Sequence, residues 1–479
     1  MRRFTTLLIT SLILGCAIVA CSKDEVYSLA VPSKSILVSM PGETGTTDFD
    51  SHNITSITVT STPEGWNVYN IDMYSGTISV TAPSSFDDKE VTEGTLSLKG
   101  YTPTGETKSI DIYVAILPNA DVDYTAAPAN CYIANAAKTR YRFNPYVGGS
   151  KTQLDTDHIA LIWESKIGVI KYLDLRNGYA SFYVGEETDD DDQPTGKITP
   201  GNALIGGYNA DGELIWSWHI WVTNSTPTTD TFMLNGREVM NLNLGADCNS
   251  EGDKDADKIF RSYGLYYQWG RRTPFVGPME WNFVGNTDAR MYNAKENVLY
   301  LAYEDSSDEI GNVTWAEDNV LSFIKGNTEN SYDWLYAGHD DTLWNSTSKS
   351  EHDPCPAGWR IADASVFENL TIASMDDDMS WEEAQPMYGW NLEDIATGES
   401  HFFTAAGRRN YLDGRLDIIN DDDFRPIPWS GYYWTATTDG AEAKALYFDL
   451  NTETRTWNAI NTSRSMHRAN ALPVRCVRE

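Results

Sequence analysis

The chain has 479 residues, of which 69 are Asp or Glu and 36 are Lys or Arg, so its formal net charge at pH 7 is −33. A surface this acidic repels the phosphate backbone of nucleic acids and anionic lipid headgroups, which argues against DNA or RNA as a partner. The length exceeds what one hydrophobic core usually serves and predicts a multidomain protein of about three domains.

A secretory signal is predicted over residues 1–20. Arg2 and Arg3 precede an apolar run, 7–19, that is too short to span a membrane as a permanent helix. The run ends in IVAC, which resembles the box that the bacterial lipoprotein signal peptidase recognises. This resemblance implies that the thiol of Cys21 takes a diacylglyceryl group and that Cys21 becomes the mature N-terminus.

The acidic sequence SKDE follows directly and resembles the surface-export signal of Bacteroidetes lipoproteins. We therefore expect a protein that is lipid-anchored in the outer membrane and exposed at the cell surface. Its only contact with the membrane would be the lipid anchor.

Residues 21–118 are expected to hold a tether and a small β-sandwich. From about Ile36 to Ile116, short β-rich runs alternate with turn sequences such as TPEG and PTG. The stretches PEGWNV and GTISVTAP resemble the BACON module, an immunoglobulin-like domain common at the N-terminus of Bacteroidetes surface proteins. We interpret this module as a spacer rather than a glycan binder, and Trp66 is as consistent with a core position as with a sugar-binding face.

Residues 119–236 are predicted to form a β-rich middle domain, because strand-like runs such as HIALIWES and YASFYV follow one another. Between them lies an acidic run, 186–192, in which like charges cannot pair with one another. We expect a solvated loop there rather than a calcium site.

The last run of the middle domain, LIWSWHIW at 214–221, contains three tryptophans. As a strand it would place Trp216 and Trp218 on one apolar face and His219 and Trp221 on the other. We expect the first face to lie in a core, because two exposed indoles would leave a sticky patch. The second face would support the junction with the next domain rather than bind sugar.

Residues 237–479 contain five separated sequence blocks whose order and spacing match those of a known domain family. The blocks are VMNLNLGA, YGLYYQWGRRTPF, DPCPAGWRIADASVFENL, GYYWTATTD and NALPVRCVRE. They resemble the Fibrobacter-type major paralogous (FISUMP) domain. The resemblance implies an α+β, C-type-lectin-like fold with a helix at ASVFENL, for which Asp363 is a good N-cap. The expected fold class is thus multidomain and mainly β, with an N-terminal immunoglobulin-like sandwich and a C-terminal lectin-like domain.

Four cysteines lie outside the signal and the lipidation site, and they are Cys131, Cys248, Cys355 and Cys476. On an oxidising export route they allow two disulfides in three connectivities. The lectin-like resemblance implies a disulfide that ties the core helix region to the last strand, between Cys355 and Cys476. A second disulfide, between Cys131 and Cys248, is possible but has much weaker support.

No pattern of catalytic residues stands out, so we do not expect an enzyme. The histidines lack His-x-x-x-His spacing, and neither a Gly-x-Ser-x-Gly elbow nor a glycine-rich phosphate loop occurs. The segment 247–258 begins like a calcium loop, but Lys258 occupies the position of the bidentate Glu. The Ca²⁺-ligating triplets of calcium-dependent lectins are also missing. We therefore predict no cofactor and no metal site, with calcium as the alternative.

The segment 381–434 mixes aromatic rings, acids and glycines without a strand or helix period. Exposed rings can bury the C–H faces of sugars while neighbouring carboxylates bind their hydroxyls. Tyr433 alternates with Tyr432 and Trp434, which should point inward, so Tyr433 should point out. The alternative is that the rings fill a long loop region. The predicted glycan-binding residues, at one exposed concave surface, are Trp390, Trp429, Tyr433, Asp421, Asp422 and Asp423.

These features together predict a cell-surface lipoprotein that acts as an adhesin or glycan-binding protein through its C-terminal domain. Its partner would be a surface or host glycan. The alternative is a structural or pilus-tip component that contacts another surface or pilus protein.

Overall fold

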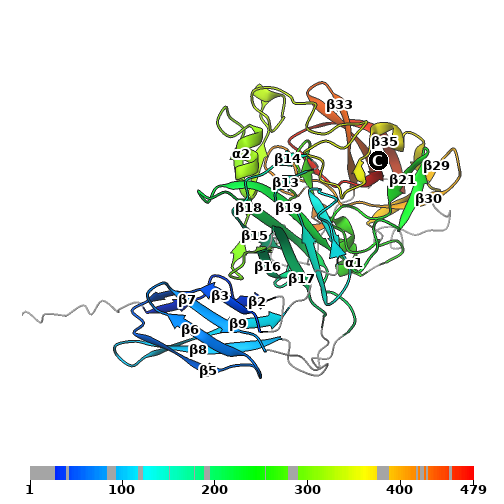
Figure 1. The fold of residues 1–479 in the computed structure, drawn as a ribbon. Helices are drawn as coiled ribbons and strands as arrows, with labels where there is room; N and C mark the ends of the chain where they lie inside the picture. Colours follow the sequence, from blue (N-terminus) through cyan, green and yellow to red (C-terminus); the bar gives the residue numbers. More distant parts are fainter. Residues whose placement is uncertain are drawn as a thin grey trace, which may run out of the picture. The chain divides into compact units, whose positions relative to one another are not determined.

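The computed structural model describes residues 27–38, 42–83, 93–116, 122–149, 151–176, 178–187, 195–253, 255–278, 290–374, 388–416, 419–420, 426–427, 430–451 and 456–479. This part of the chain is mainly β (Figure 1). It divides into two compact units, Met1–Pro118 and Asn119–Glu479.

The first unit is a β-sandwich. One sheet has the strand order β2 (Ser35–Val38), β9 (Thr107–Ile116), β8 (Glu93–Tyr101) and β5 (Ser56–Ser61). The other has the order β3 (Thr44–Asp48), β7 (Thr77–Thr81) and β6 (Asn67–Asp72), and a short pair joins β1 (Ser28–Ala30) to β4 (Asp50–His52). Alternate residues of both sheets, such as Ile78 of β7 and Ile112 of β9, share one buried core. Trp66 is 2% exposed in that core, which excludes it as a sugar-binding face.

The second unit begins with two further sheets. The larger has the order β11 (Cys131–Ala134), β19 (Leu214–Val222), β18 (Gly201–Tyr208), β15 (His158–Glu164), β23 (Met291–Tyr292) and β24 (Val298–Leu299). The smaller has the order β10 (Val122–Asp123), β12 (Thr139–Phe143), β17 (Tyr179–Val184) and β16 (Lys171–Arg176), and a short hairpin joins β13 (Val147–Gly148) to β14 (Thr152–Gln153). Their facing sides enclose an aromatic core that includes Tyr141, Phe182 and Trp218.

Strand β19 confirms the interpretation of the LIWSWHIW stretch as core plus junction. Trp216 and Trp218 face the smaller sheet and are 4% and 0% exposed. On the opposite face, Trp221 joins the core of the following segment, and its indole Nε1 donates to the carbonyl of Ala246 at 2.7 Å. His219 lies within 2.9 Å of the amide oxygen of Asn202, and burial lowers its pKa to about 3, so its ring is neutral.

The rest of the second unit consists of small sheets and short helices. Its sheets are β20 (Thr231–Leu234)–β21 (Arg237–Met240)–β37 (Cys476–Arg478)–β27 (Trp359–Ile361), β28 (Leu370–Ile372)–β29 (Gly389–Asp394)–β30 (Ser400–Thr404), β33 (Ser430–Asp439)–β34 (Glu442–Asn451)–β35 (Thr456–His467), β22 (Tyr267–Gln268)–β36 (Ala471–Leu472), β25 (Ala302–Asp305)–β26 (Ser322–Lys325) and β31 (Ile419–Asn420)–β32 (Pro426–Ile427). Its helices are α1 (Ala256–Tyr263), α2 (Val313–Asp318) and the 3₁₀ turns η1 (Thr328–Asn330) and η2 (Ala364–Phe367).

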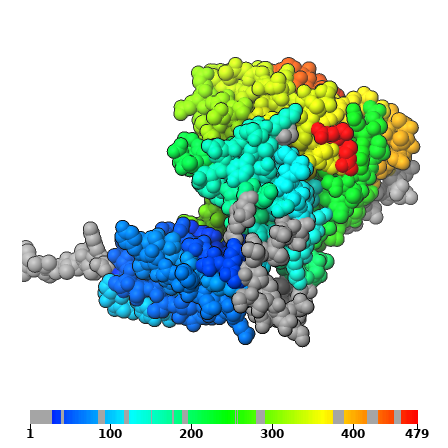
Figure 2. Space-filling model, viewed as in Figure 1, coloured from blue at the N-terminus to red at the C-terminus, as the bar shows by residue number. Residues whose placement is uncertain are grey.

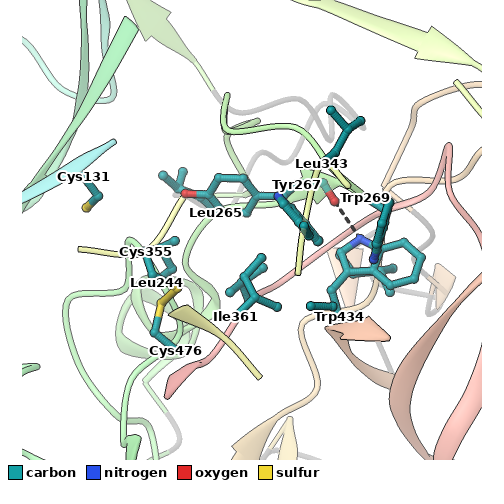
Figure 3. Packing of buried hydrophobic residues seen from close by; sticks show 14 of the residues in the cluster. Cys131, Leu244, Leu265, Tyr267, Trp269, Leu343, Cys355, Ile361, Trp434 and Cys476 are labelled. Atoms are coloured by element: carbon teal, nitrogen blue, oxygen red, sulfur yellow. Dashed lines mark hydrogen bonds between the residues drawn. A yellow bond between two sulfur atoms is a disulfide. The ribbon is translucent and has the colours of Figure 1, made fainter. Parts of the chain in front are cut away.

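Residues 119–236 and 237–479, predicted as two domains, lie in one compact unit. The predicted boundary falls in the turn between β20 and β21, and β20 belongs to the same sheet as the last strand, β37. Trp163 and Trp221 of the larger sheet share a core with Trp269 and Trp434 of the later segment. Figure 3 shows Trp269 and Trp434 in this core, together with Cys131 of the earlier segment. Figure 2 shows the cyan and green atoms of the earlier segment packed directly against the yellow atoms of the later one.

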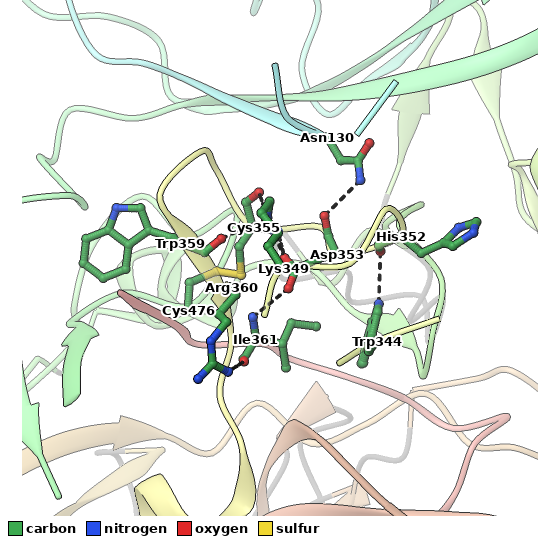
Figure 4. The surroundings of a disulfide bond; sticks show 10 residues. All are labelled: Asn130, Trp344, Lys349, His352, Asp353, Cys355, Trp359, Arg360, Ile361 and Cys476. Carbon is green, nitrogen blue, oxygen red and sulfur yellow. Dashed lines mark hydrogen bonds and ion pairs between the residues drawn. A yellow bond between two sulfur atoms is a disulfide. The ribbon is translucent and has the colours of Figure 1, made fainter. Parts of the chain in front are cut away.

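The disulfide between Cys355 and Cys476 is present, as the lectin-like resemblance implied (Figure 4). Both cysteines are fully buried. The same loop is held to the middle segment by Asn130, whose amide nitrogen donates to the carbonyl of Asp353 at 2.9 Å. Cys131 and Cys248 are both free thiols, so the possible second disulfide between them is absent.

The predicted helix at ASVFENL is only the 3₁₀ turn η2. Asp363 stands at its N-cap position but makes no capping hydrogen bond. Its carboxylate accepts the hydroxyl of Ser365 and lies 3.5 Å from the guanidinium of Arg360. These side-chain partners compete with the backbone for the carboxylate. The chain then enters β28 at Leu370, which leaves no room for a longer helix.

Candidate functional site

The predicted glycan-binding rings do not lie at the surface. Tyr433 is fully buried, and its hydroxyl donates to the carbonyl of Thr404 at 2.8 Å. Trp390 is 6% exposed, and its indole donates to the carbonyl of Ala373 at 2.9 Å. The prediction of an exposed concave surface is therefore wrong for both rings. The other predicted residues, Trp429, Asp421, Asp422 and Asp423, lie outside the described residues.

The error arose because the sheet β33–β34–β35 is covered on both faces. On one face Tyr433 packs with Leu446 and Phe403. On the other face Tyr432 and Trp434 pack in the larger core. Period-two alternation separates the two faces of a strand but does not say which face meets solvent.

A different group of aromatic rings lies on the face of the sheet that carries Tyr432 and Trp434. Tyr432 of β33 pairs across the sheet with Tyr447 of β34, and their ring centroids are 5.0 Å apart. Tyr432 is 8% exposed, whereas Tyr447 is half-buried. Such cross-strand aromatic pairs stabilise a sheet, and here the half-buried ring is that of Tyr447.

A second group of rings contains Tyr332, Tyr411 and His467, all half-buried. The ring centroids are 4.9 Å apart for Tyr332 and Tyr411, 4.6 Å for Tyr411 and His467, and 4.8 Å for Tyr332 and His467. Leu412, next in the chain, is 54% exposed and adds apolar area.

Tyr332 has a φ of 59°, in the left-handed region that a bulky residue rarely adopts. The strained backbone is held in place by close packing and hydrogen bonding. A Cβ on Gly326 would lie 2.6 Å from the Cα of Tyr332, and the amide of Tyr332 donates to the carbonyl of Asn327 at 2.8 Å. Strain of this kind is retained only where the surroundings fix the conformation, and it sets the position of the ring.

Two arginines, Arg408 and Arg464, contact the rings of Tyr432 and Tyr447. The guanidinium carbon of Arg408 lies 5.4 Å from the ring centroid of Tyr432, and that of Arg464 lies 4.0 Å from the centroid of Tyr447. Arg408 is also close enough to His467 for its charge to lower the pKa of that ring. We call these seven residues the tyrosine surface, and they are Tyr332, Tyr411, Tyr432, Tyr447, His467, Arg408 and Arg464.

Two carboxylates contact this surface. Glu442 lies 2.9 Å from Nδ1 of His467, and Asp449 accepts the hydroxyl of Tyr447. The pKa of His467 is lowered mainly by burial, against the opposing charge of Glu442. Burial first, and then the hydrogen bond to Asp449, raise the pKa of Tyr447 to about 12. Tyr447 therefore remains a neutral phenol, and at neutral pH the surface presents hydroxyls, guanidinium groups and apolar ring area together.

Sequence reasoning missed this surface because a β-bulge sets the pairing of Tyr432 with Tyr447. Near the turn, Thr438 pairs with Ala443, and continuing that register would place Tyr432 opposite Asp449. The bulge between Trp434 and Thr438 shifts the pairing by two residues. The aromatic composition of GYYW and ALYFDL was a signal, but their register was not readable from the sequence.

A hollow lined by residues that include Arg272, Glu317 and His352 lies where the two halves of the second unit meet. The guanidinium of Arg272 lies 3.6 Å from the ring centroid of Trp216 and forms an ion pair with Glu317. Glu317 in turn lies 3.2 Å from Nδ1 of His352. Because the charged groups already pair with one another, we assign this cluster a structural role at the junction.

Within the described ranges, no group of three or more His, Cys, Asp or Glu side chains is arranged to hold a metal ion. The calcium-like segment 247–258 instead leads into α1, where the carboxylate of Asp255 caps the first turn. None of the helices in the described part of the chain is long and apolar enough to cross a membrane.

No family model and no curated protein matches the chain. Solved structures that match include the D00–D0 domain of intimin, at 12% identity over 41% of this chain and 96% of that chain, with a TM-score of 0.18. The N-terminal Ig1-2 module of Drosophila receptor protein tyrosine phosphatase DLAR matches at 11% identity over 41% and 98%, with a TM-score of 0.16. SGBP-B of the Bacteroides ovatus mixed-linkage glucan utilization locus, in complex with a heptasaccharide, matches at 13% identity over 39% and 42%, with a TM-score of 0.12. Scores this low support no argument about function.

Proposed function

We propose that the chain is a lipid-anchored surface protein whose C-terminal, C-type-lectin-like region binds glycans through the tyrosine surface, without catalysis. The immunoglobulin-like first unit would serve as a spacer between the anchor and this region. The proposal rests on the close packing of three half-buried rings, those of Tyr332, Tyr411 and His467. Their centroids lie within 5 Å of one another.

The chemistry of the surface suits carbohydrate. Sugar rings present apolar C–H faces, which gain free energy when aromatic rings cover them, and hydroxyls that need hydrogen-bond partners. The tyrosine surface offers ring area from Tyr411 and a guanidinium from Arg464, and the carboxylate of Glu442 contacts it at His467. Its rings are held by strand pairing and packing, so little side-chain entropy would be lost on binding.

We expect Tyr411→Ala to weaken glycan binding about tenfold, because the loss of one ring from a sugar contact costs about 1 to 2 kcal/mol. The mature full chain is first applied to a glycan array, and the best oligosaccharide is then titrated by calorimetry. Tyr74→Ala is the matched control, since Tyr74 is fully exposed on the first unit. Equal affinities of wild type and Tyr411→Ala, with unchanged circular dichroism, would contradict the assignment of this surface.

The anchor gives a separate prediction. Cys21 lies outside the described residues, and the proposed acylation depends on its thiol. We expect Cys21→Ser to release the protein into the soluble fraction or to leave its precursor unprocessed, measured by metabolic labelling with a lipid probe and by cell fractionation. A variant that is still acylated and accessible to protease on intact cells would show that Cys21 is not the lipidated residue.

A further inference from the structure

We propose that the tyrosine surface selects glycans that carry negative charge, as the carboxylate of a uronic acid or as a sulfate. This inference rests on the proposed glycan-binding function and specifies the class of ligand. Arg464 is the residue that would bind the anionic group, and Tyr447 is the residue that positions it.

The first step is the way in which Arg464 is held. Its guanidinium carbon lies 4.0 Å from the ring centroid of Tyr447, so the cation is fixed against the aromatic ring. The Arg464 side chain also hydrogen-bonds the side chain of Tyr447. A guanidinium has five N–H donors at its edge, so one such bond leaves others for a ligand. That edge matches the two oxygens of a carboxylate or sulfate, which it binds with two parallel hydrogen bonds.

The second step is the arrangement of neighbouring acids. The carboxylate of Asp449 accepts the hydroxyl of Tyr447, and Glu442 lies against His467. Among the residues that the structure describes, no carboxylate forms an ion pair with Arg464. The acids thus orient the rings and leave the charge of Arg464 without a fixed counterion in the described structure.

The third step is the local charge. The chain as a whole carries 69 acidic and 36 basic residues. Among the described residues, the rings of the tyrosine surface contact two arginines, Arg408 and Arg464, and two carboxylates, Glu442 and Asp449. The described charges that contact these rings are therefore balanced, in a protein that is strongly acidic as a whole. An anionic ligand would therefore be repelled less at the tyrosine surface than elsewhere on the molecule.

The test compares matched oligosaccharides that are neutral, carboxylated or sulfated, titrated into the mature full chain at low and high NaCl concentration. We expect the anionic members to bind about tenfold more tightly than their neutral counterparts, with an affinity that falls as salt rises. Arg464→Gln should bring the two affinities together, and Arg464→Lys should restore part of the difference. The carboxylated and sulfated arms distinguish the two sources of charge.

Arg237→Gln is the matched control, because Arg237 is exposed on β21 and its replacement makes the same change in net charge. Equal binding of neutral and anionic oligosaccharides by wild type would overturn the inference while leaving glycan binding intact. Unchanged selectivity in Arg464→Gln would also overturn it. Failure of wild type to bind any glycan would overturn the proposed function, and the inference with it.

Discussion

Replacement of both disulfide cysteines, Cys355→Ala with Cys476→Ala, is expected to lower the free energy of unfolding of the second unit by about 4 to 5 kcal/mol. The bond closes a loop with a sequence separation of 121 residues, so it strongly restricts the unfolded chain. Chemical denaturation followed by intrinsic fluorescence measures the loss.

Cys248→Ala is the control for the disulfide prediction, because Cys248 is a free thiol only partly buried. It should change the unfolding free energy by no more than about 1 kcal/mol. Detection of reactive thiols at positions 355 and 476 in the unreduced, denatured protein would contradict the pairing.

Trp216→Ala is expected to cost about 3 to 5 kcal/mol of unfolding free energy, because it empties a large volume from the core between the two sheets. The guanidinium carbon of Arg272, which is buried, lies 3.6 Å from the ring centroid of Trp216. The indole Nε1 of Trp216 donates to the amide oxygen of Asn130 at 3.2 Å. The substitution would therefore also weaken the junction between the two halves of the unit. Thermal unfolding of the purified variant measures the effect.

Trp216→Phe provides the comparison, since it keeps an aromatic ring in the core and should be less destabilising. If Trp216→Ala kept its melting temperature and instead lost a ligand, the core assignment of this face would be wrong. That result would favour the interpretation of LIWSWHIW as a binding platform.

The sequence predicted local elements better than their assembly. The apolar face of LIWSWHIW identified Trp216 and Trp218 as core residues, and the mixed face identified Trp221 as a junction residue. The same pattern did not reveal that this junction is a continuous core. The pairing of β21 with β37 joins positions more than two hundred residues apart in the chain, and no local pattern encodes it.

Buried arginines were a second feature that sequence reasoning did not foresee. Arg475 alternates with the inward-facing Val474 and Cys476, so period two would place it in solvent. It is 2% exposed, and its guanidinium donates to the amide oxygen of Asn243 and to the carbonyl of Phe402. Burial lowers the pKa of Arg475. Its partners come from two distant segments, so its environment could not be read from the neighbouring residues.

The candidate site was only partly predictable for the same reason. The sequence located an aromatic-rich region that includes GYYW, but it selected Tyr433, whose face of the sheet is covered by Phe403 and Leu446. The half-buried ring of Tyr447 was missed because its pairing with Tyr432 depends on a bulge. Solvent exposure in a doubly covered sheet depends on the whole fold rather than on strand period.

Binding of carbohydrate at the tyrosine surface is tested most directly by a crystal structure of the mature full chain with the oligosaccharide selected on the array. We expect a sugar ring within about 4 Å of Tyr411 or Tyr447, with a polar group of the sugar at the guanidinium of Arg464. A sugar bound elsewhere, such as at the exposed Tyr69 and Tyr74 of the first unit, would contradict the account.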